Sequence, residues 1–136
     1  MYYLDTCICV DFLRGRLPYA YRLMRASKPS DFQVPAIVAA ELWYGAEHSA
    51  NPERESGIVR AFLDAFESVP FDAKAAREYG RIRQVLGSQG MLIGDRDMMI
   101  AASACVHGAT LITDNISEFS RVPGLLLESW AEVDLS

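Results

Sequence analysis

Short apolar runs alternate with longer segments of helical periodicity along this chain. Each run is bounded by polar or turn-forming residues, a pattern typical of strands buried inside a parallel sheet. Four clear strand candidates are residues 2–4, 32–34, 110–113 and 125–127. A fifth strand or connector is expected where Val69 and Phe71 flank Pro70.

Between these runs, apolar residues recur at the spacing of one helix face. Asp72 has the position of a helix N-cap, and Gly108 has that of a residue just past a helix end. The alternation of strands and helices predicts an α/β fold with a parallel sheet. The expected helices are 7–13, 18–26, 37–48, one starting at Pro52, one from Asp72 to just before Gly87, and 95–107.

Composition and charge narrow the class of protein. The chain has 136 residues, of which 51% are hydrophobic and 23% charged. This is the balance of a soluble globular protein, and the length suits one domain spanning residues 1–136. The net charge of −5 argues against a protein that grips nucleic acid by bulk positive charge. It leaves open a protein that meets phosphates through bound cations.

Nothing in the sequence points to a membrane or to an oxidising compartment. The apolar stretches are shorter than the ~20 residues that span a bilayer, and the first residues lack the pattern of a signal peptide. Three cysteines without a C-x-x-C pair favour buried thiols over disulfides or a zinc site. We therefore expect a cytoplasmic protein that makes no membrane contact.

Acidic residues stand where the predicted strands end. Asp5 follows the first strand and Asp114 the 110–113 strand, while Glu41 and Asp97 lie in the early turns of predicted helices. Ligands of an open parallel sheet bind beyond the carboxyl ends of its strands, so these side chains are expected to share one cleft. Grouped carboxylates repel one another unless cations join them, and oxygen ligands without His or Cys favour Mg²⁺ or Mn²⁺ over zinc. Such a site supports hydrolysis of phosphate esters.

Each of these acids also has a simpler interpretation. Asp5 could cap the first helix, Glu41 could lie on a solvated helix face, and Asp114 could belong to a turn after its strand. Asp95, close to Asp97, is better explained as a first-turn acid favoured by the helix dipole. It is the joint placement of the acids at strand ends that favours a site.

A set of short motifs follows in order along nearly the whole chain. The motifs are Tyr3-Leu4-Asp5-Thr6, Phe12-Leu13-Arg14-Gly15, Ala40-Glu41-Leu42-Trp43-Tyr44-Gly45, Tyr79-Gly80-Arg81-Ile82-Arg83, Ile93-Gly94-Asp95-Arg96-Asp97 leading into Ile100-Ala101-Ala102, Leu111-Ile112-Thr113-Asp114-Asn115, and Glu118-Phe119-Ser120-Arg121-Val122-Pro123-Gly124-Leu125. In these motifs the chain resembles the PIN-domain ribonucleases, and among them the VapC-type toxins of bacterial type II toxin–antitoxin modules. The ordered set is highly specific, although no single motif is.

The resemblance implies a three-layer α/β/α domain with a central parallel sheet of roughly five strands. It also implies a Mg²⁺-dependent endoribonuclease, with Mn²⁺ able to substitute, that cleaves single-stranded or tRNA-type RNA. Cleavage would leave 5′-phosphate and 3′-hydroxyl ends. A cognate antitoxin would inhibit the toxin, which would form a homodimer or a larger toxin–antitoxin assembly.

The resemblance also assigns site residues by position. Asp5, Glu41 and Asp97 match the family's three most dependable acids, and Asp95 is a variable neighbour. These acids would bind the metal and carry catalysis. The fourth acidic position has three candidates, of which the first is favoured: Asp114, Asn115 and Glu118.

One residue departs from the family pattern. The family usually has Asn two residues after the first Asp, where this chain has Cys7, and that puts the hydrogen bond orienting the first acid in doubt. Thr6, Thr113 and Asn115 are expected to support the acids or a water, with ordinary capping at strand ends as the alternative.

Two further features allow either contact with RNA or a purely structural role. A basic stretch could track RNA phosphates or form a solvated helix face. Trp43 and Tyr44, beside Glu41, could stack on a base, although packing against the sheet or a partner is the more economical interpretation. The residues of the basic stretch are Arg14, Arg16, Arg22, Arg25 and Lys28.

Two other classes of protein compete with the nuclease. A PIN-like module that binds RNA or a partner without cutting is the main alternative, and the presence of all the candidate acids weighs against it. A phosphoacceptor signalling domain would need a Lys after its last strands, but the only lysines are Lys28 and Lys74.

Overall fold

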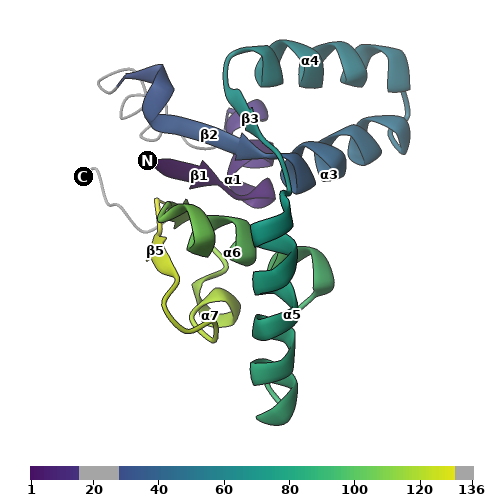
Figure 1. Cartoon of the computed structure of the whole chain (residues 1–136). Helices are drawn as coiled ribbons and strands as arrows, with labels where there is room; N and C mark the ends of the chain where they lie inside the picture. The colour runs from purple at the N-terminus through teal and green to yellow at the C-terminus, as the bar shows by residue number, and fades with distance from the viewer. Residues whose placement is uncertain (16–27, 131–136) are drawn as a thin grey trace, which may run out of the picture.

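The structure, a computed structural model, describes residues 1–15 and 28–130. Its centre is a five-stranded parallel sheet with the strand order β3-β2-β1-β4-β5 (Figure 1). Helices flank this sheet, which confirms the predicted α/β fold. The strands are β1 (Tyr2–Leu4), β2 (Phe32–Pro35), β3 (Glu67–Val69), β4 (Thr110–Ile112) and β5 (Leu126–Glu128).

The helices connect the strands in the expected alternation. α3 and α4 form a hairpin that projects from the sheet, while α5 and α6 pack against each other (Figure 1). The helix predicted over 18–26 lies outside the described residues. The described helices are α1 (Thr6–Leu13), α3 (Ala36–Glu47), α4 (Pro52–Asp64), α5 (Ala73–Ser88), α6 (Asp95–His107) and α7 (Ile116–Phe119), with a 3-10 turn η1 at Pro29–Asp31.

Side-chain caps set several of the helix starts. The Asp72 carboxylate accepts a hydrogen bond from the Ala75 backbone N–H at 2.8 Å, which confirms the predicted N-cap of α5. Asn51 caps α4 in the same way, ahead of Pro52. At the end of α6, Gly108 has φ of +66°, a left-handed conformation that glycine adopts without steric cost.

Several element ends are shifted by one residue from the prediction, and three features differ more. α5 continues through Gly87 to Ser88, and the chain reverses instead at Gly90, where φ is +66°. β3 ends at Val69 because Pro70 has no N–H to donate to a ladder. The short helix α7 was not predicted from the pattern, because four residues are too few to show helical periodicity.

The order of the strands decides where a ligand can bind. β1 pairs with β2 on one side and with β4 on the other, so the direction of winding reverses between β1 and β4. The residues of these two central strands are largely buried, and α6 packs on the core through small side chains such as Ala101, Ala102 and Ala104. In such sheets a crevice opens beyond the carboxyl ends of the strands at this switch point.

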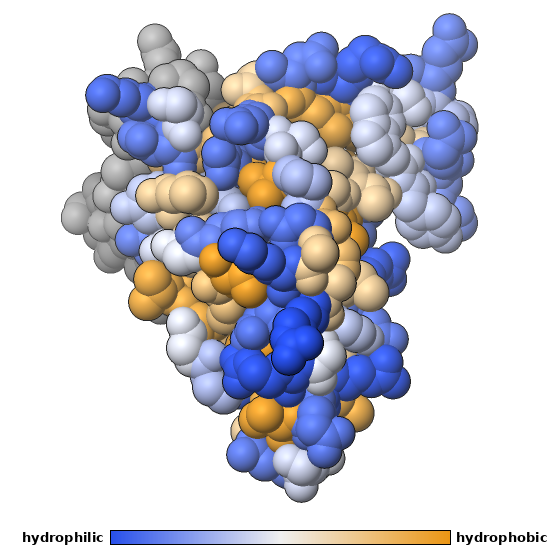
Figure 2. All heavy atoms as spheres, viewed as in Figure 1, coloured by the Kyte–Doolittle hydropathy of each residue, from blue (hydrophilic) through white to orange (hydrophobic). Residues whose placement is uncertain are grey.

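The surface in the same view is mostly hydrophilic, with hydrophobic patches near the far end of α5 and beside β5 (Figure 2). Leu92 and Leu126 are among the exposed large hydrophobic residues. None of the helices in the described part of the chain is both long and apolar enough to cross a membrane.

Candidate active site

Asp5 connects the end of β1 to the start of α1. Its Oδ1 accepts a hydrogen bond from the Thr6 backbone N–H at 2.8 Å, and its Oδ2 accepts one from the Thr113 hydroxyl at 2.7 Å. The residue is 5% exposed, and burial is the main cause that raises the pKa of its carboxyl. The hydrogen bonds oppose this rise, whereas the negative charge of Asp114 adds to it. Asp5 is thus a helix cap and also a firmly held, buried carboxylate, so its two interpretations are compatible.

Glu41 and Asp97 approach this position from two other helices. The Thr6 hydroxyl donates to Glu41 Oε1 at 3.0 Å, which holds this α3 side chain beside the start of α1. Asp97 lies half-buried in the first turn of α6. Beside these two acids is a cavity of about 400 Å³, lined by Glu41 and residues 94–97.

The electrostatics of Asp97 show which acids lie near one another. Burial is the largest cause that raises the pKa of Asp97 to about 6, and the negative charges of Asp5, Glu41 and Glu118 raise it further. The positive charge of Arg96 acts in the opposite direction. Four carboxylates from β1, α3, α6 and α7 therefore share one electrostatic environment at the switch point.

The three candidates for the fourth acidic position divide between two places. Asp114 is exposed and lies on the Asp5 side, where its charge raises the pKa of Asp5. Glu118, on α7, raises the pKa of Asp97 instead. Asn115 supports this arrangement, because its side-chain amide donates to Glu118 Oε2 at 3.3 Å and its backbone N–H donates to the Thr113 hydroxyl at 3.0 Å.

Cys7 stands between two of the acids. Its Sγ lies 3.3 Å from Asp5 Oδ2 and 2.6 Å from Asp114 Oδ1, so its one S–H proton can be donated to either carboxylate. Burial, with the charge of Asp5, raises the pKa of the Cys7 thiol, so it remains a protonated donor. Cys7 therefore contacts the first acid, a role expected of the family's Asn.

Of the other predicted residues, Asp95 lines the same cavity but its carboxylate has partners elsewhere, and several basic residues lie outside the described residues. The Asp95 carboxylate accepts a hydrogen bond from the Tyr79 hydroxyl at 3.0 Å and lies near Arg83, as suits a first-turn acid on the helix surface. Arg14 and Lys28 are exposed. The rest of the basic stretch, Arg16, Arg22 and Arg25, lies outside the described residues.

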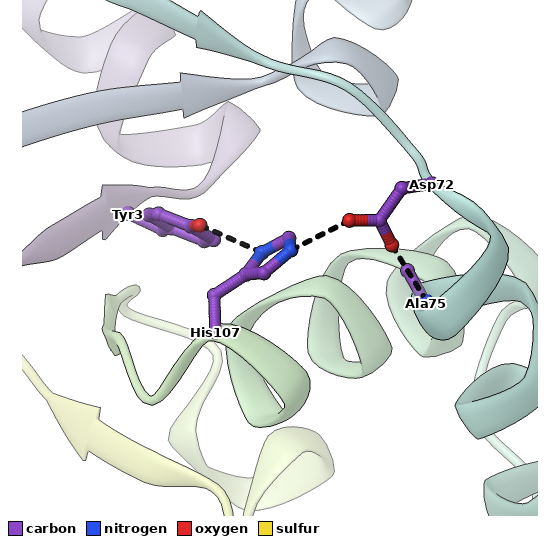
Figure 3. A network of polar contacts seen from close by, with 4 residues as sticks. All are labelled: Tyr3, Asp72, Ala75 and His107. Atoms are coloured by element: carbon purple, nitrogen blue, oxygen red, sulfur yellow. Dashed lines mark hydrogen bonds and ion pairs between the residues drawn. The ribbon is translucent and has the colours of Figure 1, made fainter.

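A second polar network joins β1, α5 and α6 (Figure 3). The Tyr3 hydroxyl lies 2.8 Å from His107 Nδ1, and His107 Nε2 lies 2.9 Å from Asp72 Oδ2. Burial, with the charges of Asp72 and Glu67, raises the pKa of Tyr3 to about 12, so the phenol is no nucleophile near neutral pH. His107 is also about 15 Å along α6 from Asp97 at 1.5 Å per residue. This network therefore ties elements together and does not form a catalytic triad.

The donor set at the switch point fits a hard divalent cation. The prospective ligands are carboxylates, which Mg²⁺ and Mn²⁺ prefer, and burial together with their mutual repulsion raises the pKa of Asp97. Among the described residues, no group of three or more acidic, His or Cys side chains is already arranged to hold a metal ion. Asp5, Glu41 and Asp97 would hold the cation once the side chains of Glu41 and Asp97 turn toward it.

Comparison with known proteins places the chain in a family. The profile of the PIN domain matches residues 2–125, so the chain belongs to the PIN-domain family. Within it, the chain is similar to VapC proteins. Ribonuclease VapC2 of Rickettsia felis is 39% identical over 96% of this chain and 98% of its own length.

Two further relatives support this placement. The tRNA(fMet)-specific endonuclease VapC of Salmonella typhimurium is 35% identical over 93% of this chain and 96% of its own length. A crystal structure of VapBC2 from Rickettsia felis, bound to a DNA fragment from their promoter, superposes with a TM-score of 0.87 at 36% identity. That match covers 95% of this chain and 98% of the other.

Proposed function

We propose that the chain is a Mg²⁺-dependent endoribonuclease that acts as the toxin of a type II toxin–antitoxin pair. The observation that carries the proposal is the convergence of Asp5, Glu41 and Asp97 beyond the carboxyl ends of β1 and β4. Asp5 is buried there, and Thr6 hydrogen-bonds both Asp5 and Glu41. The VapC ribonucleases that the chain resembles support the same reaction.

Asp5 and Asp97 differ in how they would bind the cation in this proposal. A bound divalent cation would supply an activated water and stabilise the leaving oxygen. Asp5 is preset for cation binding because Thr6 and Thr113 fix both of its oxygens. Asp97, with its pKa raised to about 6, must give up its proton before it can bind a cation. Hydrolysis would break the P–O3′ bond, leaving 5′-phosphate and 3′-hydroxyl ends.

The substrate and the partner follow from the relatives and from the surface. The name of the Salmonella relative, a tRNA(fMet)-specific endonuclease, supports single-stranded or tRNA-type RNA as the substrate. Solved VapBC complexes support a cognate antitoxin that inhibits the enzyme. A groove of about 390 Å³ gives such a partner an apolar surface, with Val10, Leu13, Leu42 and Ile58 in its lining. We also propose a cytoplasmic homodimer, alone or within a larger assembly with the antitoxin.

The test compares RNA cleavage by the wild-type chain and by Asp5→Ala, in Mg²⁺ and after chelation. We expect the wild type to cut single-stranded RNA only with Mg²⁺ or Mn²⁺, and Asp5→Ala to be inactive although it folds, as checked by circular dichroism. Equal cleavage by both proteins would contradict the proposal. Binding of RNA without cleavage under any metal would favour the non-catalytic PIN-like module instead.

A further inference from the structure

Tyr44 on α3 exposes an aromatic ring beside the candidate active site. It is 63% exposed, the largest value among the exposed large hydrophobic residues of the described chain. Its ring stacks on His48, with the ring centroids 5.6 Å apart and the planes 12° from parallel. The neighbouring Trp43 differs, because it packs against the core and lies under the Arg60 guanidinium. The two aromatic side chains beside Glu41 therefore have different roles, and only Tyr44 presents a free face.

The position of Tyr44 relative to Glu41 follows from helix geometry. Glu41, Tyr44 and His48 stand at i, i+3 and i+7, on one stripe of α3. At 1.5 Å per residue, Tyr44 lies about 4.5 Å and His48 about 10.5 Å along the axis from Glu41. The stacked rings of Tyr44 and His48 therefore lie next to Glu41 on α3, toward the carboxyl end of the helix.

The groove described above as a surface for the antitoxin lies on the neighbouring stripe of α3, and among its charged residues are one cation, Arg14, and two acids, Glu41 and Glu55. Glu41, Gly45 and Ser49 line it from α3, and Arg14 lines it from the end of α1. Arg14 is exposed and can meet a phosphate, while Glu55 on α4 adds a negative charge to the same groove. RNA that occupied this groove in place of the antitoxin would meet Arg14 with its backbone, while the Tyr44 ring, which does not line the groove, stands on the adjoining stripe of α3.

We propose that Tyr44, backed by His48, is a stacking platform for one unpaired nucleobase of the RNA substrate. This inference rests on the proposed nuclease function and adds a recognition element to it. An uncharged base face suits a position beside Glu41, where a phosphate would be repelled. Every base has a π-face, so the platform accepts any unpaired base and rejects a paired one, whose faces are covered by its helical neighbours. The proposed specificity is therefore for single-stranded segments next to the scissile bond.

The experiment measures binding and cleavage separately. Binding uses single-stranded RNA with 2-aminopurine at successive positions, a probe whose fluorescence falls when it stacks, in an Asp97→Asn background with Mg²⁺ so that the probe stays intact. Cleavage kinetics use the otherwise wild-type chain. Tyr44→Phe keeps the ring, and Tyr44→Leu keeps apolar bulk without a π-face. Leu126→Ala, which trims an exposed side chain on β5, is the matched control for lost surface hydrophobicity.

We expect Tyr44→Leu to abolish the quenching at one position and to weaken RNA binding roughly 5- to 50-fold. KM should rise by a similar factor while kcat stays within twofold, and Tyr44→Phe and Leu126→Ala should behave like the wild type. An abasic nucleotide at the quenched position should weaken binding to the wild type but have no further effect on Tyr44→Leu.

The possible outcomes distinguish a failure of the stacking platform from a failure of the proposed nuclease function. If the wild type cleaves RNA and Tyr44→Leu binds and cleaves equally well, the platform is wrong and the nuclease stands. If the wild type neither binds nor cleaves RNA, both fail. If Tyr44→Leu changes only the oligomeric state in sedimentation velocity, the Tyr44 face is a protein interface and the inference is overturned.

Discussion

β1 carries two polar networks on residues that are close in sequence, and they differ in charge. Around Tyr3, a neutral phenol, an imidazole and the single carboxylate of Asp72 form a line in which each group has a partner. Around Asp5, by contrast, several carboxylates gather, and their charges add to burial in raising the pKa of Asp97. In the first network, the hydrogen-bonding groups of Tyr3, His107 and Asp72 are therefore satisfied within the protein. The second carries excess negative charge at the switch point of the sheet, which is the property expected of a cation site.

The largest expected effect is on RNA cleavage when Asp97 is neutralised, and Asp95, in the same turn of α6, provides the matched control. Asp97→Asn should lower RNA cleavage by at least about 100-fold, the scale of losing an electrostatic group at a reaction centre. Asp95→Asn should stay within about twofold of the wild type, because its carboxylate binds Tyr79 and Arg83 on the surface. Initial rates on one RNA, with equal Mg²⁺, measure both variants.

Because the two changes are chemically identical and only two residues apart, a difference in activity between the variants reports the position of the charge. Thermal unfolding in chelator checks that each variant is folded. Equal loss of cleavage in both would show that the negative charge of the α6 start matters as a whole, and would remove the special position of Asp97.

Substitutions in the network of Tyr3, His107 and Asp72 should lower the free energy of unfolding and leave RNA cleavage almost unchanged. His107→Ala removes the partners of Tyr3 and Asp72, and two hydrogen bonds of a part-buried group stabilise a fold by about 1–2 kcal/mol together. We expect that loss of unfolding free energy in urea, with RNA cleavage within twofold at 25 °C. Tyr3→Phe, which removes only the hydroxyl, should cost about half as much.

The opposite result for His107→Ala would contradict this assignment. A large loss of cleavage by His107→Ala, with unchanged stability, would give the Tyr3 network a catalytic part and end its contrast with the acid cluster.

Most of the fold could be predicted from the sequence because its strands and helices are signalled locally. The central strands are apolar runs with polar ends, and Asp72 and Gly108 carry the caps that they were expected to carry. The differences arise where the local signal is weak. β3 is a strand at the edge of the sheet whose Glu67 and Ser68 are exposed, so no buried apolar run marks it. Edge strands depend on pairing with a neighbour that only the tertiary fold provides.

The candidate site was predictable in outline for the same reason, since parallel topology gathers strand ends. What could not be predicted were the contacts between side chains remote in sequence. The thiol of Cys7 meets Asp114, which lies 107 residues further along the chain, and no local pattern encodes that contact. Likewise Glu118 approaches Asp97 only because α7, too short to predict, turns it toward α6. The ligand roles of these acids stay predictions.

The smallest expected effect concerns the pH dependence of stability, and it tests whether burial and the neighbouring acids disfavour the charged form of Asp97. The pKa of Asp97 rises from 3.8 to about 6 on folding, so the native state binds this proton more tightly than the unfolded state. The resulting stabilisation is fully present below pH 3.8 and is lost as the pH rises through about 6. Asp97→Asn should therefore be more stable than the wild type at pH 8 in chelator, by about 1 kcal/mol after allowance for solvent screening at a half-buried group.

Saturating Mg²⁺ should reverse this order of stability, because only the wild type gains binding energy. Urea unfolding at pH 5 and pH 8, with and without Mg²⁺, measures the stability of both proteins. Equal stability at pH 8 in chelator would mean that neither burial nor the neighbouring acids disfavour the charged Asp97 carboxylate.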